Sequence, residues 1–177
     1  MVNLPGVSIS DERASTVDVR PACRRDIDAL LEIERQCFNV PHYGYFVLER
    51  QDFEGYLEEA DCVFLVALID KPTARPAGYV LGPAGVRRNP LWAHIDSIAV
   101  RRDVRRQGAG SLLLRSFIAE ARRRGCRQVT LEVSPANEAG MAFFARHGLR
   151  TVRKLPHYYG RNRPGLLMAT TTRQEAP

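Results

Sequence analysis

The chain has 177 residues, of which 45% are hydrophobic and 26% are charged, and this composition excludes a disordered chain, a collagen-like fibre and a small disulfide scaffold. Its 26 basic and 20 acidic residues give a net charge of +6, and only two of the basic residues, Lys71 and Lys154, are lysines. Excess positive charge suggests an anionic partner such as nucleic acid, a membrane surface or a phosphorylated cofactor.

Residues 1–15 are polar and lack periodicity, so we expect a flexible N-terminus, a single domain over residues 16–171 and a flexible tail over 172–177. The first half of that domain predicts, in chain order, a strand over 16–21, helices over 24–38 and 47–60, and strands over 63–69, 77–81 and 91–100. The apolar face of the first helix follows a helical period that includes Glu34.

The second half predicts a helix over 107–124, a strand over 129–133, a helix over 137–147 and strands over 150–155 and 166–170. The strand–helix–strand unit around 107–124 demands a parallel crossover, whereas the adjacent strands early and late in the chain indicate antiparallel hairpins. The expected fold class is α/β, a three-layer domain with a mixed central β-sheet flanked by about four helices.

The junction between residues 100 and 111 has the features of a phosphate site. The helix opens on four small residues, Gly108, Ala109, Gly110 and Ser111. Beside them lie four arginines, Arg101, Arg102, Arg105 and Arg106. The first amides of a helix have no partner within it, and the helix dipole favours a negative group there. The alternative is a tight turn with a solvated basic flank, and the spacing matches neither a P-loop nor a dinucleotide fingerprint.

Arg105-x-x-Gly108-x-Gly110, followed by Leu131-Glu132-Val133 and then Asn137, resembles the GNAT superfamily of acyl-CoA-dependent N-acyltransferases, most closely its bacterial ribosomal-protein-alanine N-acetyltransferase branch. The resemblance implies a GNAT-like fold and acetyl-CoA as co-substrate, without a metal. It implies that the coenzyme A pyrophosphate lies on the amides of Arg106, Gln107, Gly108, Ala109, Gly110 and Ser111. It also implies that pantetheine pairs with the backbone of Ile98, Ala99 and Val100 and bonds to Asn137.

Acetyl transfer to an amine needs a base, because the amine is protonated at neutral pH. Glu132 lies within an apolar strand, at the position where the related branch has a catalytic Glu, and the alternative is a Glu that faces solvent. His94, on the same strand face as Asp96, is the second candidate base, because a neutral His is suited to this role near pH 7. The amide of Val100 is the expected donor to the developing oxyanion.

The general acid of the related branch is a Tyr twelve residues after the Glu, and here that position is Phe144. The Phe144 ring can pack against the sulfur end of pantetheine, but it cannot donate a proton. Tyr159 is the expected catalytic substitute and Tyr158 an expected substrate contact, both from the final hairpin loop. The alternative is a pair of half-exposed rings packed on a hairpin.

The segment that joins the first two helices carries Phe38, His42, Tyr43, Tyr45 and Phe46. In the superfamily this segment shapes the acceptor pocket, so Phe38 and Tyr43 are expected to contact the acceptor together with Asp96 and Tyr158. We expect an amine-bearing peptide or protein N-terminus. The alternatives are a small-molecule amine and a non-catalytic acyl-CoA-binding domain, the latter suggested by the missing Tyr.

Other partners are not expected. The four cysteines form no Cys-x-x-Cys pair, so we expect free buried thiols and neither a metal nor a disulfide. The arginines are not interleaved with aromatic residues, which argues against nucleic acid. No apolar run reaches the roughly 20 residues of a membrane helix, and no secretory signal is visible, so the prediction is a cytoplasmic monomer or homodimer without a membrane partner.

Overall fold

The computed structural model describes residues 17–38, 47–69, 75–85 and 92–171. The predicted flexible ends over 1–15 and 172–177 lie outside the described residues, as does Tyr43 among the candidate acceptor contacts.

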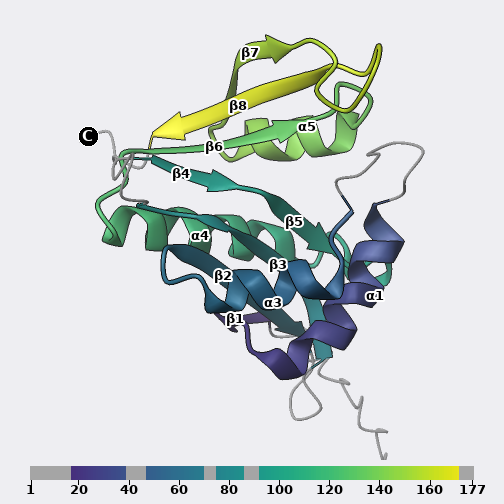
Figure 1. Cartoon of the computed structure of the whole chain (residues 1–177), viewed down its shortest axis with the longest axis vertical. Coiled ribbons are helices and arrows are strands. Elements are labelled where there is room, and N and C mark those ends of the chain that lie inside the picture. The colour runs from purple at the N-terminus through teal and green to yellow at the C-terminus, as the bar shows by residue number, and fades with distance from the viewer. Residues whose placement is uncertain (1–16, 39–46, 70–74, 86–91, 172–177) are drawn as a thin grey trace, which may run out of the picture.

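The described residues form eight strands, four α-helices and two short 3-10 helices, arranged as Figure 1 shows. In chain order these elements are β1 (Val17–Pro21), η1 (Arg24–Asp26), α1 (Ile27–Cys37), α3 (Arg50–Glu58), β2 (Cys62–Ile69), β3 (Arg75–Pro83), β4 (Trp92–Ile95), β5 (Ser97–Val100), η2 (Arg102–Val104), α4 (Ala109–Arg123), β6 (Gln128–Val133), α5 (Glu138–Arg146), β7 (Arg150–Leu155) and β8 (Gly165–Thr171). The predicted α/β class is confirmed, although α3 is shorter and β3 longer than expected.

The strands are arranged in two four-stranded sheets. The first has the order β1-β2-β3-β5 and is antiparallel throughout. The second has the order β4-β6-β8-β7, in which β4 and β6 are parallel and the other pairs are antiparallel. The parallel pair is the predicted crossover, with α4 as its helix.

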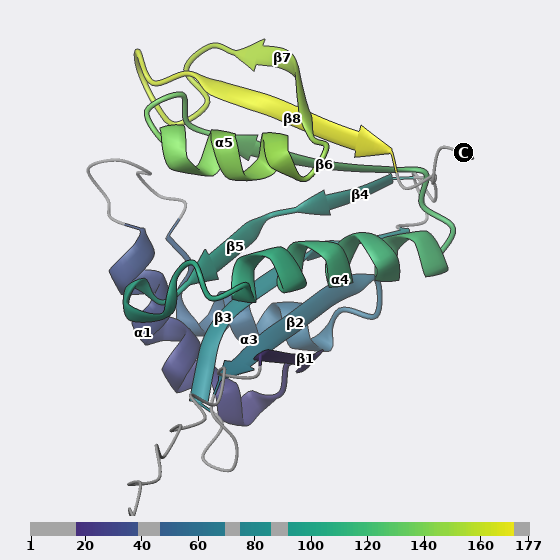
Figure 2. The same ribbon diagram turned by 180° about the vertical axis from the view of Figure 1, so that it is seen from behind.

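The prediction of one strand over 91–100 is wrong, because the backbone bends at Asp96. The residues before the bend form β4 and pair with β6, whereas those after it form β5 and pair with β3. Strand β3 passes close to the bend: the Asp96 amide donates to the Leu81 carbonyl at 3.0 Å, and a Cβ on Gly82 would collide with the His94 carbonyl oxygen. Seen from behind, β5 continues from β4, while the other strands of the second sheet, β6, β8 and β7, lie further from α4 (Figure 2).

Helices cover both faces of the first sheet. Side chains alternate along β2, so Val63 packs in a cluster with Phe117 of α4, whereas Phe64 packs in a second cluster with Leu30 of α1 and Phe53 of α3. Each fully buried side chain of this size stabilises the fold by about 1.5–3 kcal/mol. The layers are therefore α1 and α3, the sheet, and α4, as Figures 1 and 2 show from opposite sides.

The cysteines only partly follow the expectation of buried thiols. Cys62 and Cys126 are buried, Cys37 is half-buried and Cys23 is exposed. Burial raises the pKa of the Cys62 thiol to about 12, so it stays protonated. Within the described ranges, no group of three or more His, Cys, Asp or Glu side chains is placed to hold a metal ion. In the same part of the chain, no helix is long and apolar enough to cross a membrane.

Candidate active site

A pocket opens beside the bend that separates β4 from β5. Its walls come from that bend, from β6 and α5, from the end of α1 and from the loop between β7 and β8. The lining residues are Phe38, Ile95, Asp96, Ser97, Ile98, Leu131, Glu132, Val133, Asn137, Phe144, Tyr158 and Tyr159. The pocket therefore brings together residues that the sequence assigns separately to the base, the cofactor site and the acceptor site.

Glu132 lies at the centre of the polar contacts in this pocket. Its Oε2 atom is 2.8 Å from Nε2 of His94 and accepts a hydrogen bond of 3.1 Å from the Tyr158 hydroxyl. Its side chain is 15% exposed. Burial alone raises the pKa of Glu132, but the hydrogen bonds from His94 and Tyr158 and the nearby His94 outweigh it and hold the pKa below its ordinary value. Glu132 is therefore a carboxylate at neutral pH.

Asp96 lies near the same nitrogen of the His94 ring. Its Oδ1 atom is 3.7 Å from His94 Nε2, and its Oδ2 atom accepts a 2.7 Å hydrogen bond from the Tyr56 hydroxyl. Burial raises the pKa of Asp96, and the bond from Tyr56 only partly opposes this. Two carboxyl groups thus flank one ring nitrogen.

The second nitrogen of His94 faces the neighbouring strand. Nδ1 is 2.8 Å from Oγ1 of Thr130, which also accepts a 2.9 Å hydrogen bond from Nε1 of Trp92. The Trp92 ring stacks on the His94 ring at 5.2 Å between centroids.

Sequence reasoning missed Trp92, Thr130 and Tyr56. The first two carry a usable signal, because each lies two residues before a candidate base on the same face of its strand. Tyr56 carries none, since its contact with Asp96 joins residues 40 positions apart.

The two tyrosines of the β7–β8 loop both line the pocket. Their rings meet edge to face at 4.9 Å, and the Tyr159 amide donates to the Arg163 carbonyl at 2.9 Å within the loop. Phe144 is 7% exposed and belongs to the core cluster around α4, while its ring also reaches the pocket. These three aromatic residues thus all contribute to the pocket lining.

Strand β5 lies at the end of the first sheet, so it pairs with β3 along only one of its two edges. The Arg101 amide donates to the Ala77 carbonyl at 2.8 Å, so Ala99, two residues earlier, also pairs toward β3. The alternation of an antiparallel ladder then directs the N–H and C=O groups of Ile98 and Val100 to the opposite edge. The backbone of Ala99, which the resemblance assigns to pantetheine, faces β3 instead.

Two side chains reach the Val100 carbonyl at that edge. It accepts hydrogen bonds from Arg105 Nε at 3.2 Å and from Cys37 Sγ at 3.3 Å, and Arg105 Nη2 lies 3.5 Å from the same sulfur. Arg105 thus turns toward β5. Arg101 is likewise engaged, with Asp103 at 2.7 Å.

The predicted phosphate site lies at the start of α4. Gly108 is the N-cap, with φ 90° and ψ −11°, and Arg106 also has a positive φ of 64°. The Leu112 amide donates to the Gly108 carbonyl at 2.9 Å, so the amides of residues 109–111 precede the first helical bond and have no partner within the helix. Arg106 and Gln107 are exposed, Gly110 and Ser111 are half-buried, and Ala109 is buried in the core.

Asn137 caps α5 next to the pocket. Its Oδ1 atom accepts a 2.9 Å hydrogen bond from the Gly140 amide, and its side chain lines the pocket. The helix start and the amide side chain thus lie at the same wall as Phe144.

Comparison with known families finds a match over most of the domain. The model of the Acetyltransferase (GNAT) family matches residues 27–149. An uncharacterised N-acetyltransferase of Methanocaldococcus jannaschii is 32% identical over 158 residues, which cover 85% of this chain and 88% of that protein. An N-alpha-acetyltransferase of Sulfurisphaera tokodaii is 28% identical over 160 residues, which cover 85% and 90% of the two chains.

Solved structures show the same fold. The ribosomal-protein-S18-alanine N-acetyltransferase of Escherichia coli superimposes with a TM-score of 0.73 at 21% identity, covering 91% of this chain and 97% of that one. Arabidopsis thaliana NAA60 in complex with acetyl-CoA superimposes with a TM-score of 0.74 at 19% identity, covering 88% and 98%.

Proposed function

The chain belongs to the Acetyltransferase (GNAT) family and is an acetyl-CoA-dependent acetyltransferase, and we propose that its acceptor is the α-amino group of a peptide or protein N-terminus. Relatives named N-alpha-acetyltransferase from three archaea support this acceptor, at 26–28% identity. The observation that carries the proposal is the pocket in which Glu132 and Asp96 face an opening bordered by Phe38 and two tyrosines. Two carboxyl groups attract an ammonium group, and aromatic walls suit the backbone and side chain that follow it.

The described residues fit acetyl-CoA at two places. The free amides of residues 109–111 and the positive end of the α4 dipole suit the phosphates, with the exposed Arg106 beside them. The open edge of β5 offers the backbone of Ile98 and Val100 to the pantetheine arm, and Asn137 faces it from α5. An arm that pairs with the Val100 carbonyl takes the place of the contacts from Arg105 and Cys37.

We assign each step of the transfer to a residue of this chain. Bound acetyl-CoA supplies the acetyl group as an activated thioester. The pair of Glu132 and His94 takes the proton of the acceptor ammonium, which frees the nitrogen lone pair to form the C–N bond. The Val100 amide donates to the carbonyl oxygen as it gains negative charge. As the C–S bond breaks, Tyr159 donates its proton to the leaving sulfur, the role for which Phe144 lacks a hydroxyl.

The test is release of coenzyme A with a panel of N-terminal peptides and a panel of small amines. We expect turnover with peptides, and we expect Glu132→Gln to lower kcat/KM by about 10²–10⁴-fold, the usual contribution of a general base. Glu32→Gln, on the exposed face of α1, is the matched control and should leave turnover unchanged. Turnover with small amines alone contradicts the proposed acceptor. Binding of acetyl-CoA without turnover on either panel indicates a non-catalytic domain.

A further inference from the structure

Four side chains of β4 and β6 form a continuous row that ends at the pocket. Trp92 Nε1 donates to Thr130 Oγ1 at 2.9 Å, Thr130 Oγ1 lies 2.8 Å from His94 Nδ1, and His94 Nε2 lies 2.8 Å from Glu132 Oε2. The parallel register places His94 directly opposite Thr130. Every ring nitrogen in this row has a polar partner, so the protons along it can be assigned.

The assignment begins at Glu132. A carboxylate only accepts hydrogen bonds, and Oε2 already accepts one from Tyr158. His94 Nε2, at 2.8 Å, must therefore carry a proton and donate it to Glu132. In the neutral ring the lone pair is then on Nδ1, which faces Thr130 and not the pocket.

The other end of the row is consistent with this tautomer. The indole N–H of Trp92 only donates, so it occupies one acceptor position of Thr130 and leaves the hydroxyl proton for another partner. That proton goes to His94 Nδ1 at 2.8 Å when the ring is neutral. When the ring is charged, Nδ1–H donates to Thr130, whose hydroxyl can turn to the Ala93 carbonyl at 3.4 Å.

The two candidate bases differ in their access to the pocket. Glu132 and Asp96 line the pocket, whereas His94 is not among the described residues that line it. An acceptor amine in the pocket therefore meets the carboxylate before the imidazole.

We propose that Thr130 is a positioning residue: by donating to Nδ1 it holds in place the ring of His94, whose Nε2–H orients Glu132, so that Glu132 alone receives the proton of the acceptor ammonium. This deepens the proposed function and rests on it for the identity of the acceptor. The ionisable groups that face the pair are Asp96 from the β4–β5 bend and Tyr158 from the β7–β8 loop, with Tyr56 and Glu59 behind Asp96.

The first test needs no acceptor. Nitrogen NMR of the imidazoles of the free protein at neutral pH should show His94 as the Nε2–H tautomer, with its signal assigned by its loss in His94→Gln. Thr130→Ser keeps a hydroxyl and should leave the Nδ1 signal in place, whereas Thr130→Val removes the hydrogen bond to Nδ1 and should shift that signal downfield, toward that of an imidazole nitrogen without a donor. Thr151→Val on the exposed β7 strand is the matched control and should leave the His94 signal unchanged. An Nδ1–H tautomer in the unmodified protein overturns the proposal.

The second test separates a positioning His from a basic one by its effect on acetylation. The amide of His94→Gln can donate to Glu132 but cannot take a proton, so this variant should keep kcat/KM within about tenfold, the worth of one altered hydrogen bond. His94→Ala loses the donor and should fall further, by about 10²-fold. Equal losses in both variants overturn the proposal, as they would mean that the ring itself is the base. If no peptide is acetylated, the proposed acceptor is wrong, and the NMR signal still decides the tautomer.

Discussion

Among single residues, Glu34 is a buried carboxyl group outside the pocket. The residue is 1% exposed. The Oε1 atom of Glu34 accepts a 2.8 Å hydrogen bond from the Leu48 amide, and its Oε2 atom accepts one from the Tyr79 hydroxyl. That hydroxyl also lies 2.9 Å from Ser97 Oγ. These contacts join α1 to the chain before α3 and to both β3 and β5. Burial raises the pKa of Glu34 more than its hydrogen bonds lower it.

This burial predicts a dependence of stability on pH. Because the pKa of Glu34 is higher in the folded state, its contribution is fully present below the pKa of the unfolded chain and is lost as pH rises through the folded pKa. Glu34→Gln keeps an acceptor for Leu48 without a charge. The free energy of unfolding in urea between pH 4 and pH 8 should therefore fall, relative to this variant, as pH rises. Glu32→Gln on the same helix should run parallel to the unmodified protein, and a parallel course for Glu34→Gln would contradict the argument.

At the scale of the element, the role of the start of α4 in binding acetyl-CoA can be tested separately from its contribution to folding stability. Gly108 and Gly125 stand at opposite ends of this helix with φ of 90° and 84°, and a Cβ on either would meet nothing within 4 Å. Alanine at each position should therefore cost the same roughly 1–2 kcal/mol of backbone strain in urea unfolding. Only Gly108→Ala places a methyl group where phosphates would approach. Calorimetry should show about tenfold weaker acetyl-CoA binding, about 1.4 kcal/mol, for this variant alone. Equal affinities would contradict the phosphate site.

Some elements of the fold are determined by residues close together in the sequence, and others by contacts between distant segments. Helix α4 and its two flanking glycines follow from the apolar period and from turn chemistry within a few residues. The bend at Asp96 could not be predicted, because the segment from Ala93 to Val100 contains no Gly or Pro that would mark a break in the strand. It arises where β3 approaches at Gly82 and where β6 takes β4 as its neighbour, and both are contacts distant in sequence.

At the scale of the whole molecule, the site also combines features set by local sequence with features set by distant contacts. The motif around Gly108 and the residues Glu132 and His94 are visible in the sequence, because local spacing carries them. The distance of 2.8 Å between His94 and Glu132 depends on the parallel pairing of β4 with β6, two strands that α4 separates along the chain. The partners of Asp96 and Glu34, Tyr56 and Tyr79, lie 40 and 45 residues away along the chain, and no periodic pattern predicts such pairs.

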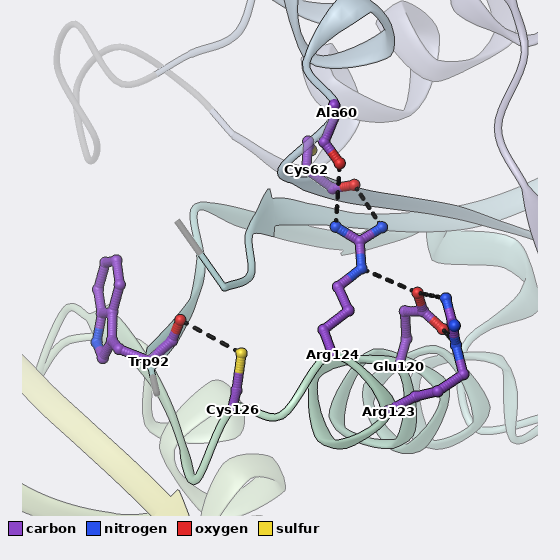
Figure 3. A network of polar contacts seen from close by, with 7 residues as sticks. All are labelled: Ala60, Cys62, Trp92, Glu120, Arg123, Arg124 and Cys126. Carbon is purple, nitrogen blue, oxygen red and sulfur yellow. Dashed lines mark hydrogen bonds and ion pairs between the residues drawn. The ribbon is translucent and has the colours of Figure 1, made fainter. Parts of the chain in front are cut away.

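The far end of α4 is bound to the α3–β2 connection through one arginine, as Figure 3 shows. Arg124 donates to the Ala60 carbonyl at 3.3 Å, to the Cys62 carbonyl at 3.1 Å and to Glu120 at 2.9 Å. Its neighbour Arg123 bonds only to Glu120 among these groups, and its side chain is 73% exposed. Arg124 thus joins the end of α4 to the connection between α3 and β2, and Arg123 does not.

This difference predicts unequal effects of the same substitution. Arg124→Met keeps much of the aliphatic stem but removes the donors to two backbone carbonyls, and it should lower the free energy of unfolding by about 1–2 kcal/mol. Arg123→Met removes only an exposed ion pair and should leave stability unchanged. Urea unfolding of both variants at one pH measures the contrast. Since the network lies at the end of α4 away from Gly108, acetyl-CoA affinity should be unaltered in both. Equal stabilities of the two variants would show that the carbonyl contacts of Arg124 do not stabilise the fold.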